Sequence, residues 1–219
     1  MAGLASYPVL IVDDHELFST ALMIAMRGHG LDARKVPVGR LNEYLSSAQS
    51  ESPGLVVLDL DLGRDAEGRW VNAVDMTGLL CSRGWIVLIV SDSADAPELA
   101  AAIAAGAVGS VPKSGSFELL LDVVLAAAEG RPVMTDIERQ SWLTKHEAFR
   151  SWERELSRRL ALLSPREREI LEQLAEGHRA EEIAERLLIP FMTVLTQISA
   201  ILVKFGVDSP SEAVALIRQ

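Results

Sequence analysis

Residues 9–18 read Val-Leu-Ile-Val-Asp-Asp-His-Glu-Leu-Phe, and this stretch decides the fold of the first part of the chain. Four apolar residues, three of them β-branched, end abruptly at two aspartates. A continuous apolar run of this length is typical of a strand that is buried on both faces, as in a parallel sheet. Similar runs follow at residues 55–58, 86–90 and 108–111, with a weaker one at 34–37.

Longer stretches with helical spacing separate these apolar runs. They cover about residues 15–29, 39–48, 70–82, 94–105 and 116–128. Alternation of strands and helices implies right-handed crossovers between parallel strands. The sequence therefore predicts an α/β domain over residues 1–128, built on a five-stranded, doubly wound parallel sheet. In such sheets, ligands bind beyond the carboxyl ends of the strands.

Polar side chains follow four of the predicted strands directly. They are Asp13 and Asp14, Asp59, Ser91 and Lys113. We expect them to converge in one crevice, because the carboxyl ends of parallel strands share one edge of the sheet. Clustered carboxylates repel one another unless a hard cation such as Mg²⁺ neutralises them, while a lysine and a hydroxyl hold phosphoryl oxygens. The set predicts phosphoryl transfer to a carboxylate, although any one of these acids alone would more simply cap a helix or close a turn.

Four segments carry a family resemblance. They are Val12–Phe18, Val57–Asp59, Val90–Ser91 and Val111–Ser114, and in this order they resemble the receiver domain of a two-component response regulator of the LuxR/NarL/FixJ type. The resemblance covers about residues 1–128. It implies a flavodoxin-like receiver, which is a phosphoacceptor domain.

The resemblance implies a role for each polar position. Asp59 would accept a phosphoryl group from the phosphohistidine of a sensor histidine kinase. The implied Mg²⁺ ligands are Asp13, Asp14, Asp59 and Asp61, the last through its backbone carbonyl. Ser91 would be the switch hydroxyl that moves toward the phosphoryl group, and Lys113 would pair with that group.

Three features depart from the family pattern. Ser110 stands where the family usually has an aromatic residue whose rotamer change reports phosphorylation at the surface, and serine cannot make that change. Asp92 adds a charge where a small side chain is usual. The loop over residues 61–69 is longer and more polar than usual and lacks the common proline.

One enzyme class shares part of this pattern. Asp59-Leu60-Asp61 also matches the nucleophile motif of haloacid-dehalogenase-like phosphatases. In those enzymes the metal-binding carboxylate pair comes after the nucleophile, whereas the pair at residues 13–14 precedes it here. Motif order therefore argues against a phosphatase, and we expect a regulator and not an enzyme.

Residues 129–160 form a connector that is predicted to be helical. Thr135 and Glu138 have the spacing of a capping box at its start. A stripe of residues recurs every seven positions: Trp142, Phe149, Leu156 and Leu163. The stripe fits a helix packed either on the protein's own domains or on a partner, and the sequence leaves both interpretations open.

Residues 161–219 predict a second, smaller all-α domain. Ser164, Pro165 and Glu167 form a strong helix start. That helix runs to Gly177, and three more are expected over about residues 180–187, 192–205 and 209–217. The second and third have the proportions of a helix-turn-helix.

This segment resembles a LuxR-type DNA-binding domain. The residues that carry the resemblance are Leu163–Leu171, Glu182–Ala184, Thr193–Val194 and Ile201–Val207. In that family the third helix of the domain enters the major groove. The candidate DNA-binding residues are Arg179, Thr193, Thr196, Gln197, Ser199 and Lys204.

The predicted recognition helix is unusual in its charge. No charged residue occurs from Ile189 to Val203, although contacts to phosphates require basic side chains. An alternative function therefore stays open, namely a regulator that acts by protein–protein interaction, with weak or no conventional phosphorylation switching or DNA binding. In that case the third helix would contact a protein.

Composition limits the remaining possibilities. The 219 residues carry a net charge of −10, divided as −8, +1 and −3 over residues 1–128, 129–160 and 161–219. Such an acidic chain does not simply coat nucleic acid or an anionic membrane. A single cysteine excludes a disulfide framework. The start resembles no signal peptide, and no apolar run approaches the roughly 20 residues of a membrane span.

These observations lead to one expectation. The sequence predicts a cytoplasmic, homodimeric regulator of transcription that binds promoter DNA and does not associate with a membrane. Its partners would be a sensor histidine kinase and double-stranded DNA, and its cofactor would be Mg²⁺.

Overall fold

The computed structural model describes residues 7–41, 44, 53–65, 68–92 and 97–218. The density of contacts divides the chain into a first unit, residues 1–147, and a second unit, residues 148–219. The predicted connector, residues 129–160, is therefore shared between the two units.

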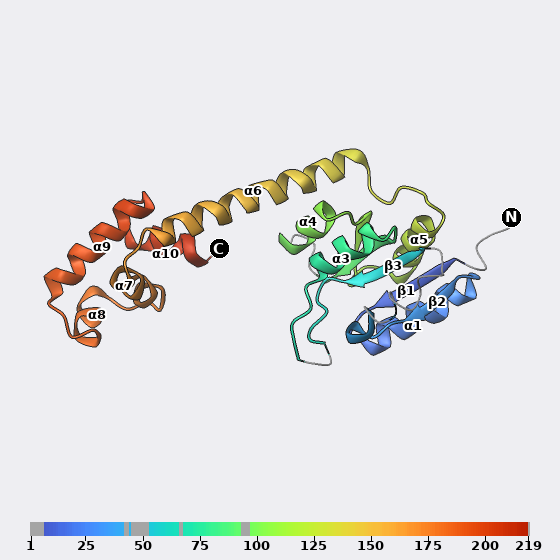
Figure 1. The fold of residues 1–219 in the computed structure, drawn as a ribbon, viewed down its shortest axis with the longest axis horizontal. Coiled ribbons are helices and arrows are strands. Elements are labelled where there is room, and N and C mark those ends of the chain that lie inside the picture. The colour runs from blue at the N-terminus through green and yellow to red at the C-terminus, as the bar shows by residue number, and fades with distance from the viewer. Residues whose placement is uncertain (1–6, 42–43, 45–52, 66–67, 93–96, 219) are drawn as a thin grey trace. The chain divides into compact units, whose positions relative to one another are not determined.

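The first unit is built on a parallel sheet (Figure 1). Its strands are β1 (Pro8–Val12), β2 (Asp32–Lys35), β3 (Leu55–Asp59), β4 (Ile86–Ser91) and β5 (Gly109–Pro112). They lie in the order β2-β1-β3-β4-β5, and every neighbouring pair is parallel. This confirms the predicted five-stranded, doubly wound sheet.

Helices cover both faces of this sheet. They are α1 (Glu16–Gly28), α3 (Ala73–Ser82), α4 (Pro97–Ala104) and α5 (Phe117–Ala128). Leu10 and Val12 belong to one core, with residues of α3 and α4, whereas Val9 and Ile11 belong to the other, with residues of α1 and α5. Alternate residues of one fully buried strand thus supply both cores, which explains its unbroken apolar run.

The predicted helix over residues 39–48 lies mostly outside the described residues. Within the described part, Val38–Arg40 forms a single 3₁₀ turn. The other helices of the unit follow the prediction but begin one to three residues later, and α3 and α5 each follow a residue whose side chain caps the helix. Asn72, for example, accepts hydrogen bonds from the backbone N–H groups of Val74 and Asp75 and so begins α3.

The predicted connector forms α6 (Asp136–Ala161), which crosses the boundary between the units. Thr135 and Glu138 form the expected reciprocal cap, with N–H to oxygen distances of 2.8 and 3.2 Å. Trp142 packs against the core of the first unit, and Leu156 packs against the core of the second. Three of the four residues of the stripe, Trp142, Leu156 and Leu163, therefore pack on the protein's own units.

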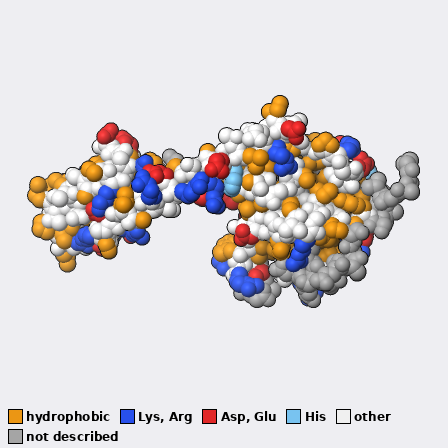
Figure 2. Space-filling view, turned by 45° about the horizontal axis from the view of Figure 1, so that its top comes forward, with side chains coloured by type: hydrophobic (Ala, Val, Ile, Leu, Met, Phe, Trp, Pro, Cys, Tyr) orange, Lys and Arg blue, Asp and Glu red, His pale blue; other side chains and the backbone are white. Residues whose placement is uncertain are grey.

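The second unit consists of short helices. With the end of α6 they are α7 (Pro165–Ala175), α8 (Ala180–Arg186), α9 (Phe191–Phe205) and α10 (Pro210–Arg218). The Ser164–Glu167 capping box is present. The axes of α8 and α9 differ by 116°, as in a helix-turn-helix. Figure 2 shows hydrophobic side chains gathered at the end of this unit where α9 begins.

No single helix in the described ranges is both long and apolar enough to cross a membrane. The bent pair α8 and α9 meets that test of length and composition only when its two helices are taken together.

Candidate functional site

Two carboxylates and one ammonium group meet at the carboxyl edge of the sheet. Asp59 is the last residue of β3, and its side chain, like that of Asp13, is 3% exposed. Lys113, just after β5, places its Nζ atom 2.5 Å from Oδ2 of Asp59 and 2.9 Å from Oδ2 of Asp13. These three residues, 100 positions apart at the extremes, form one buried charge cluster.

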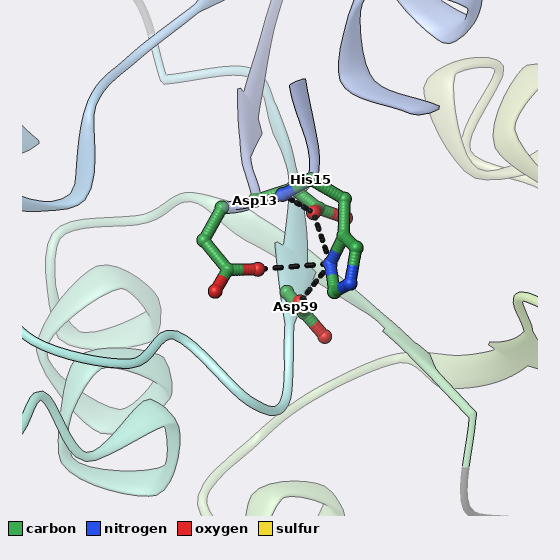
Figure 3. Close-up of side chains that lie close together, drawn as sticks. Asp13, His15 and Asp59 are labelled. Atoms are coloured by element: carbon green, nitrogen blue, oxygen red, sulfur yellow. Dashed lines mark hydrogen bonds and ion pairs between the residues drawn. The ribbon is translucent and has the colours of Figure 1, made fainter. Parts of the chain in front are cut away.

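His15 joins the same cluster. Its Nδ1 atom lies 2.8 Å from Asp14, 3.3 Å from Asp13 and 3.8 Å from Asp59. Figure 3 shows the imidazole ring directed at the carboxylates of Asp13 and Asp59. The backbone N–H of His15 also donates to Oδ1 of Asp13 at 2.7 Å. This histidine has no predicted role, and its position directly after the aspartate pair is its one sequence signal.

The environment shifts the protonation of this cluster. Burial raises the pKa of Asp59, and the nearby Asp13 adds to that effect, while the hydrogen bond from Lys113 opposes it. Burial alone lowers the pKa of Lys113, but its bonds to the two carboxylates together outweigh burial, and the net shift is upward. The lysine therefore stays charged and holds the oxygens of both acids.

An open pocket of about 360 Å³ lies over Asp59. Its lining includes three residues with predicted roles. Ser91 is the predicted switch hydroxyl, Lys113 the predicted phosphate partner, and Asp61 the residue whose carbonyl is predicted to bind the metal. The backbone N–H of Asp61 donates to Oδ1 of Asp59 at 3.2 Å, which fixes the loop after β3 to the acceptor. Asp92, whose charge departs from the family pattern, lines this same pocket.

The carboxylates of the cluster have the chemistry of a magnesium site. Asp13, Asp14, His15 and Asp59 each offer one ligand atom, and these atoms all lie within 4.8 Å of one another. Mg²⁺ prefers oxygen ligands and retains several waters, so three carboxylates beside an open pocket fit it. Asp61 lines the pocket, but its side chain does not belong to this group.

The described residues of the long polar loop after β3, on either side of positions 66–67, pair as a small hairpin. Arg64 and Trp70 pair as a β-bridge, and the Arg64 guanidinium lies 4.4 Å from the centre of the indole ring. Asp65 binds Arg69 across the turn at 2.8 Å. The first part of this loop lies beside the acidic cluster, since Arg64 and Asp65 line a pocket with Asp14.

The second unit distributes the predicted DNA-binding residues over α8 and α9. Thr193, Thr196 and Ser199 are exposed on α9, whereas Gln197 is half-buried. Arg179 is exposed and caps the start of α8. The structure thus gathers most of the candidates around the helix-turn-helix.

Lys204 is engaged within the protein. Its Nζ atom lies 2.7 and 2.6 Å from the two carboxylate oxygens of Glu167, the buried acid of the capping box. An ammonium held in this way must leave a buried carboxylate before it can contact a phosphate.

Known proteins with this organisation are bacterial regulators. Residues 161–217 match the family described as bacterial regulatory proteins of the luxR family. The nitrate/nitrite response regulator protein NarP of Escherichia coli (strain K12) is 30% identical over 216 residues, which cover 97% of this chain and 95% of NarP. The transcriptional regulatory protein LiaR of Bacillus subtilis (strain 168) is 27% identical over 94% of this chain and 93% of its own length.

Solved structures include similar chains. The response regulator ChrA of a heme-sensing two-component system is 26% identical, with a TM-score of 0.49, over 99% of this chain and 98% of its own. The sequence relatives carry the assignment: this chain belongs to the family of response regulators of the NarL/LuxR type. The predicted family and fold class are thereby confirmed.

Proposed function

We propose that this protein regulates transcription by accepting a phosphoryl group on Asp59 and binding promoter DNA through its second unit. The observation that carries the proposal is the meeting of Asp13, Asp59 and Lys113 at the edge of the sheet, next to an open pocket. Buried carboxylates beside a fixed lysine suit transfer of a phosphoryl group, because such transfer depends on positioning and on charge compensation.

In the proposed reaction, a carboxylate oxygen of Asp59 attacks the phosphorus of a phosphohistidine on a sensor kinase. The P–O bond forms as the P–N bond breaks, and the leaving imidazole keeps the electron pair and takes up a proton. Mg²⁺ held by Asp13, Asp14, Asp59 and the carbonyl of Asp61 would neutralise the phosphoryl oxygens. Lys113 already bonds to Asp59 and follows the new negative charge.

The switch lacks the aromatic residue that the family usually has at the position of Ser110. Ser91 is buried at the end of β4 and lines the pocket, and in the proposed reaction its hydroxyl would bond a phosphoryl oxygen. Ser110 on β5 supplies no aromatic ring, so we propose that the loops around the pocket carry the signal instead. Among these loops is the hairpin at Arg64 and Trp70.

For the second unit, we propose that α9 enters the major groove. The contacting set would be Arg179, Thr193, Thr196, Gln197, Ser199 and Lys204. A homodimer in the cytoplasm is the form that we propose for binding, since two-fold symmetry matches paired half-sites in DNA. We propose a regulatory and not an enzymatic role, with the phosphoryl group serving as signal.

Mass spectrometry tests the central step. Incubation of the whole chain with acetyl phosphate and Mg²⁺ should add one phosphoryl group, and Asp59→Asn should abolish the addition. Asp61→Asn is the matched control, because the proposal uses only its backbone carbonyl, and it should keep the added mass. A wild-type protein whose mass never changes, at any Mg²⁺ concentration, would refute phosphorylation at Asp59.

A further inference from the structure

The outward face of α9 is apolar. Met192 is 68% exposed and Val203 is 83% exposed, and Leu188 in the preceding turn is 91% exposed. Phe191, at the first position of the helix, is also exposed. Leu188, Phe191 and Met192 lie around the start of α9, and Figure 2 shows hydrophobic side chains gathered at that end of the unit. Nothing charged interrupts the face, since residues 189–203 carry no charge.

The hydroxyl groups on this face are turned toward the helix. Oγ1 of Thr196 donates to the carbonyl of Met192 at 2.9 Å, and Oγ of Ser199 donates to the carbonyl of Leu195 at 3.0 Å. A threonine whose hydroxyl bonds the preceding turn presents its methyl group to the surroundings. Thr196 therefore extends the apolar surface of Met192, four positions earlier on the same side of the helix.

Most basic side chains of the unit are occupied. Arg166 binds Glu169 at 2.5 Å and the carbonyl of Leu187 at 3.0 Å. The other occupied groups are Arg168 on the carbonyl of Leu160, Lys204 on Glu167 and Arg218 on the carbonyl of Ala175. In the described part of residues 161–219, Arg179 and Arg186 are the two basic residues whose side chains make neither an ion pair nor a hydrogen bond. Few phosphate contacts are available to each copy.

A surface of this kind recognises one feature of duplex DNA. In the major groove, hydrogen-bonding side chains distinguish bases by donors and acceptors, while apolar side chains contact the 5-methyl group of thymine. The first turns of a recognition helix supply the contacts to base edges. Met192, Thr193 and Thr196 occupy those turns, whereas Val203 lies about 16 Å farther along the axis, at 1.5 Å per residue.

We infer that α9 selects its DNA by the thymine methyl groups that Met192, Thr193 and Thr196 contact, with few phosphate contacts in support. This inference rests on the proposed DNA binding of the second unit. It assigns specificity to van der Waals contact and not to charged side chains. The absence of carboxylates on the face is also required, because they would repel the phosphates.

The experiment begins with selection from a random library of double-stranded DNA. The full chain, treated with acetyl phosphate and Mg²⁺, should enrich half-sites that contain thymine at fixed positions. The selected duplex is then made with deoxyuridine in place of each thymine in turn, which removes only the 5-methyl group. Each deoxyuridine that replaces a contacted thymine should weaken binding about fourfold. This factor corresponds to the loss of one buried methyl group at ~0.8 kcal/mol.

Two further measurements separate this readout from a structural effect. Met192→Ala should bring the ratio of thymine to deoxyuridine affinity at its own position close to one, whereas Val203→Ala, the matched control on an equally apolar position, should leave every ratio unchanged. The slope of log affinity against log salt concentration should be about −2 for each bound protein molecule. Arg179 and Arg186 would each contact one phosphate, and each such contact contributes ~0.9 to the magnitude of the slope.

The outcomes distinguish this inference from the proposed function. Selected DNA that binds equally well with deoxyuridine at every position overturns the inference and leaves DNA binding intact. A chain that enriches no sequence overturns both. If, in addition, Met192→Asp then dissociates an oligomer of the chain, the apolar face is a protein contact.

Discussion

Replacing Glu167 by alanine should destabilise the second unit more than replacing any other charged residue of α7 by alanine. Glu167 is 5% exposed and accepts hydrogen bonds from two directions. Its carboxylate accepts from the backbone N–H of Ser164 at 2.6 Å, which begins α7, and from Lys204 at 2.7 and 2.6 Å, which ties α9 to that start. One side chain thus joins a helix cap to a tertiary ion pair.

The magnitude follows from the two interactions. Loss of a helix cap costs about 1 kcal/mol, and loss of a hydrogen bond to a charged group costs about 1.5–3 kcal/mol. The Lys204 side chain is 32% exposed and regains water, so no buried charge is left behind. We expect Glu167→Ala to lower the free energy of unfolding by about 3 kcal/mol. For a domain of this size, that lowers the melting temperature by roughly 12–24 °C.

Differential scanning calorimetry of the whole chain measures this effect. Glu167→Gln should cost about half as much, because its amide oxygen still accepts from Ser164. Glu169→Ala is the matched control on the same helix. Its partner Arg166 forms a partly exposed pair, worth less than about 1 kcal/mol. If Glu167→Ala and Glu169→Ala shift the transition equally, the Lys204–Glu167 pair does not stabilise the fold.

Three other predictions follow from single contacts. Gly54→Ala should unfold the first unit, since its Cβ atom would lie 2.0 Å from the carbonyl oxygen of Pro8. In Gly28→Ala the added Cβ atom meets no atom within 4 Å, and urea denaturation should show the free energy of unfolding raised by about 0.5–1 kcal/mol. Lys113→Met should destabilise the metal-free protein by about 3 kcal/mol and tighten Mg²⁺ binding, because two buried carboxylates lose their ammonium partner. Equal Mg²⁺ affinities of the variant and the wild type in a titration would contradict this. The Lys204 bond lowers the pKa of Glu167, so its stabilisation is complete above the ordinary value of 4.5 and is lost as the pH falls below it. The stability difference between wild type and Glu167→Gln should therefore shrink between pH 6 and pH 3, and a constant difference would refute the assignment.

The receiver site was largely predictable from local patterns. A strand buried on both faces must be a continuous apolar run, and the residue after it must lie at the carboxyl edge. These two constraints located Asp13, Asp59, Ser91 and Lys113 without knowledge of any distance. They could not locate His15, because whether its ring turns into the cluster depends on how α1 leaves the sheet.

The hairpin after β3 shows the same limit. The sequence showed a loop of unusual length and polarity over residues 61–69. Its order comes from a bridge between Arg64 and Trp70 and from the ion pair of Asp65 with Arg69. Pairings of this kind depend on the turn geometry that brings two short segments together, and residue types alone do not specify it.

By itself, the sequence determined the class of this protein, the order of its strands and helices and the caps that begin α6 and α7. Each of these follows from short-range rules of periodicity and hydrogen bonding. Tertiary structure decided which charged side chains remain free to contact a ligand. Lys204 was a candidate for phosphate contact, yet packing places it on Glu167, 37 positions earlier in the chain. Because an ionic side chain acts through whatever lies within a few ångströms, only the folded arrangement shows that Lys204 is held by Glu167 and that the exposed face of α9 is apolar.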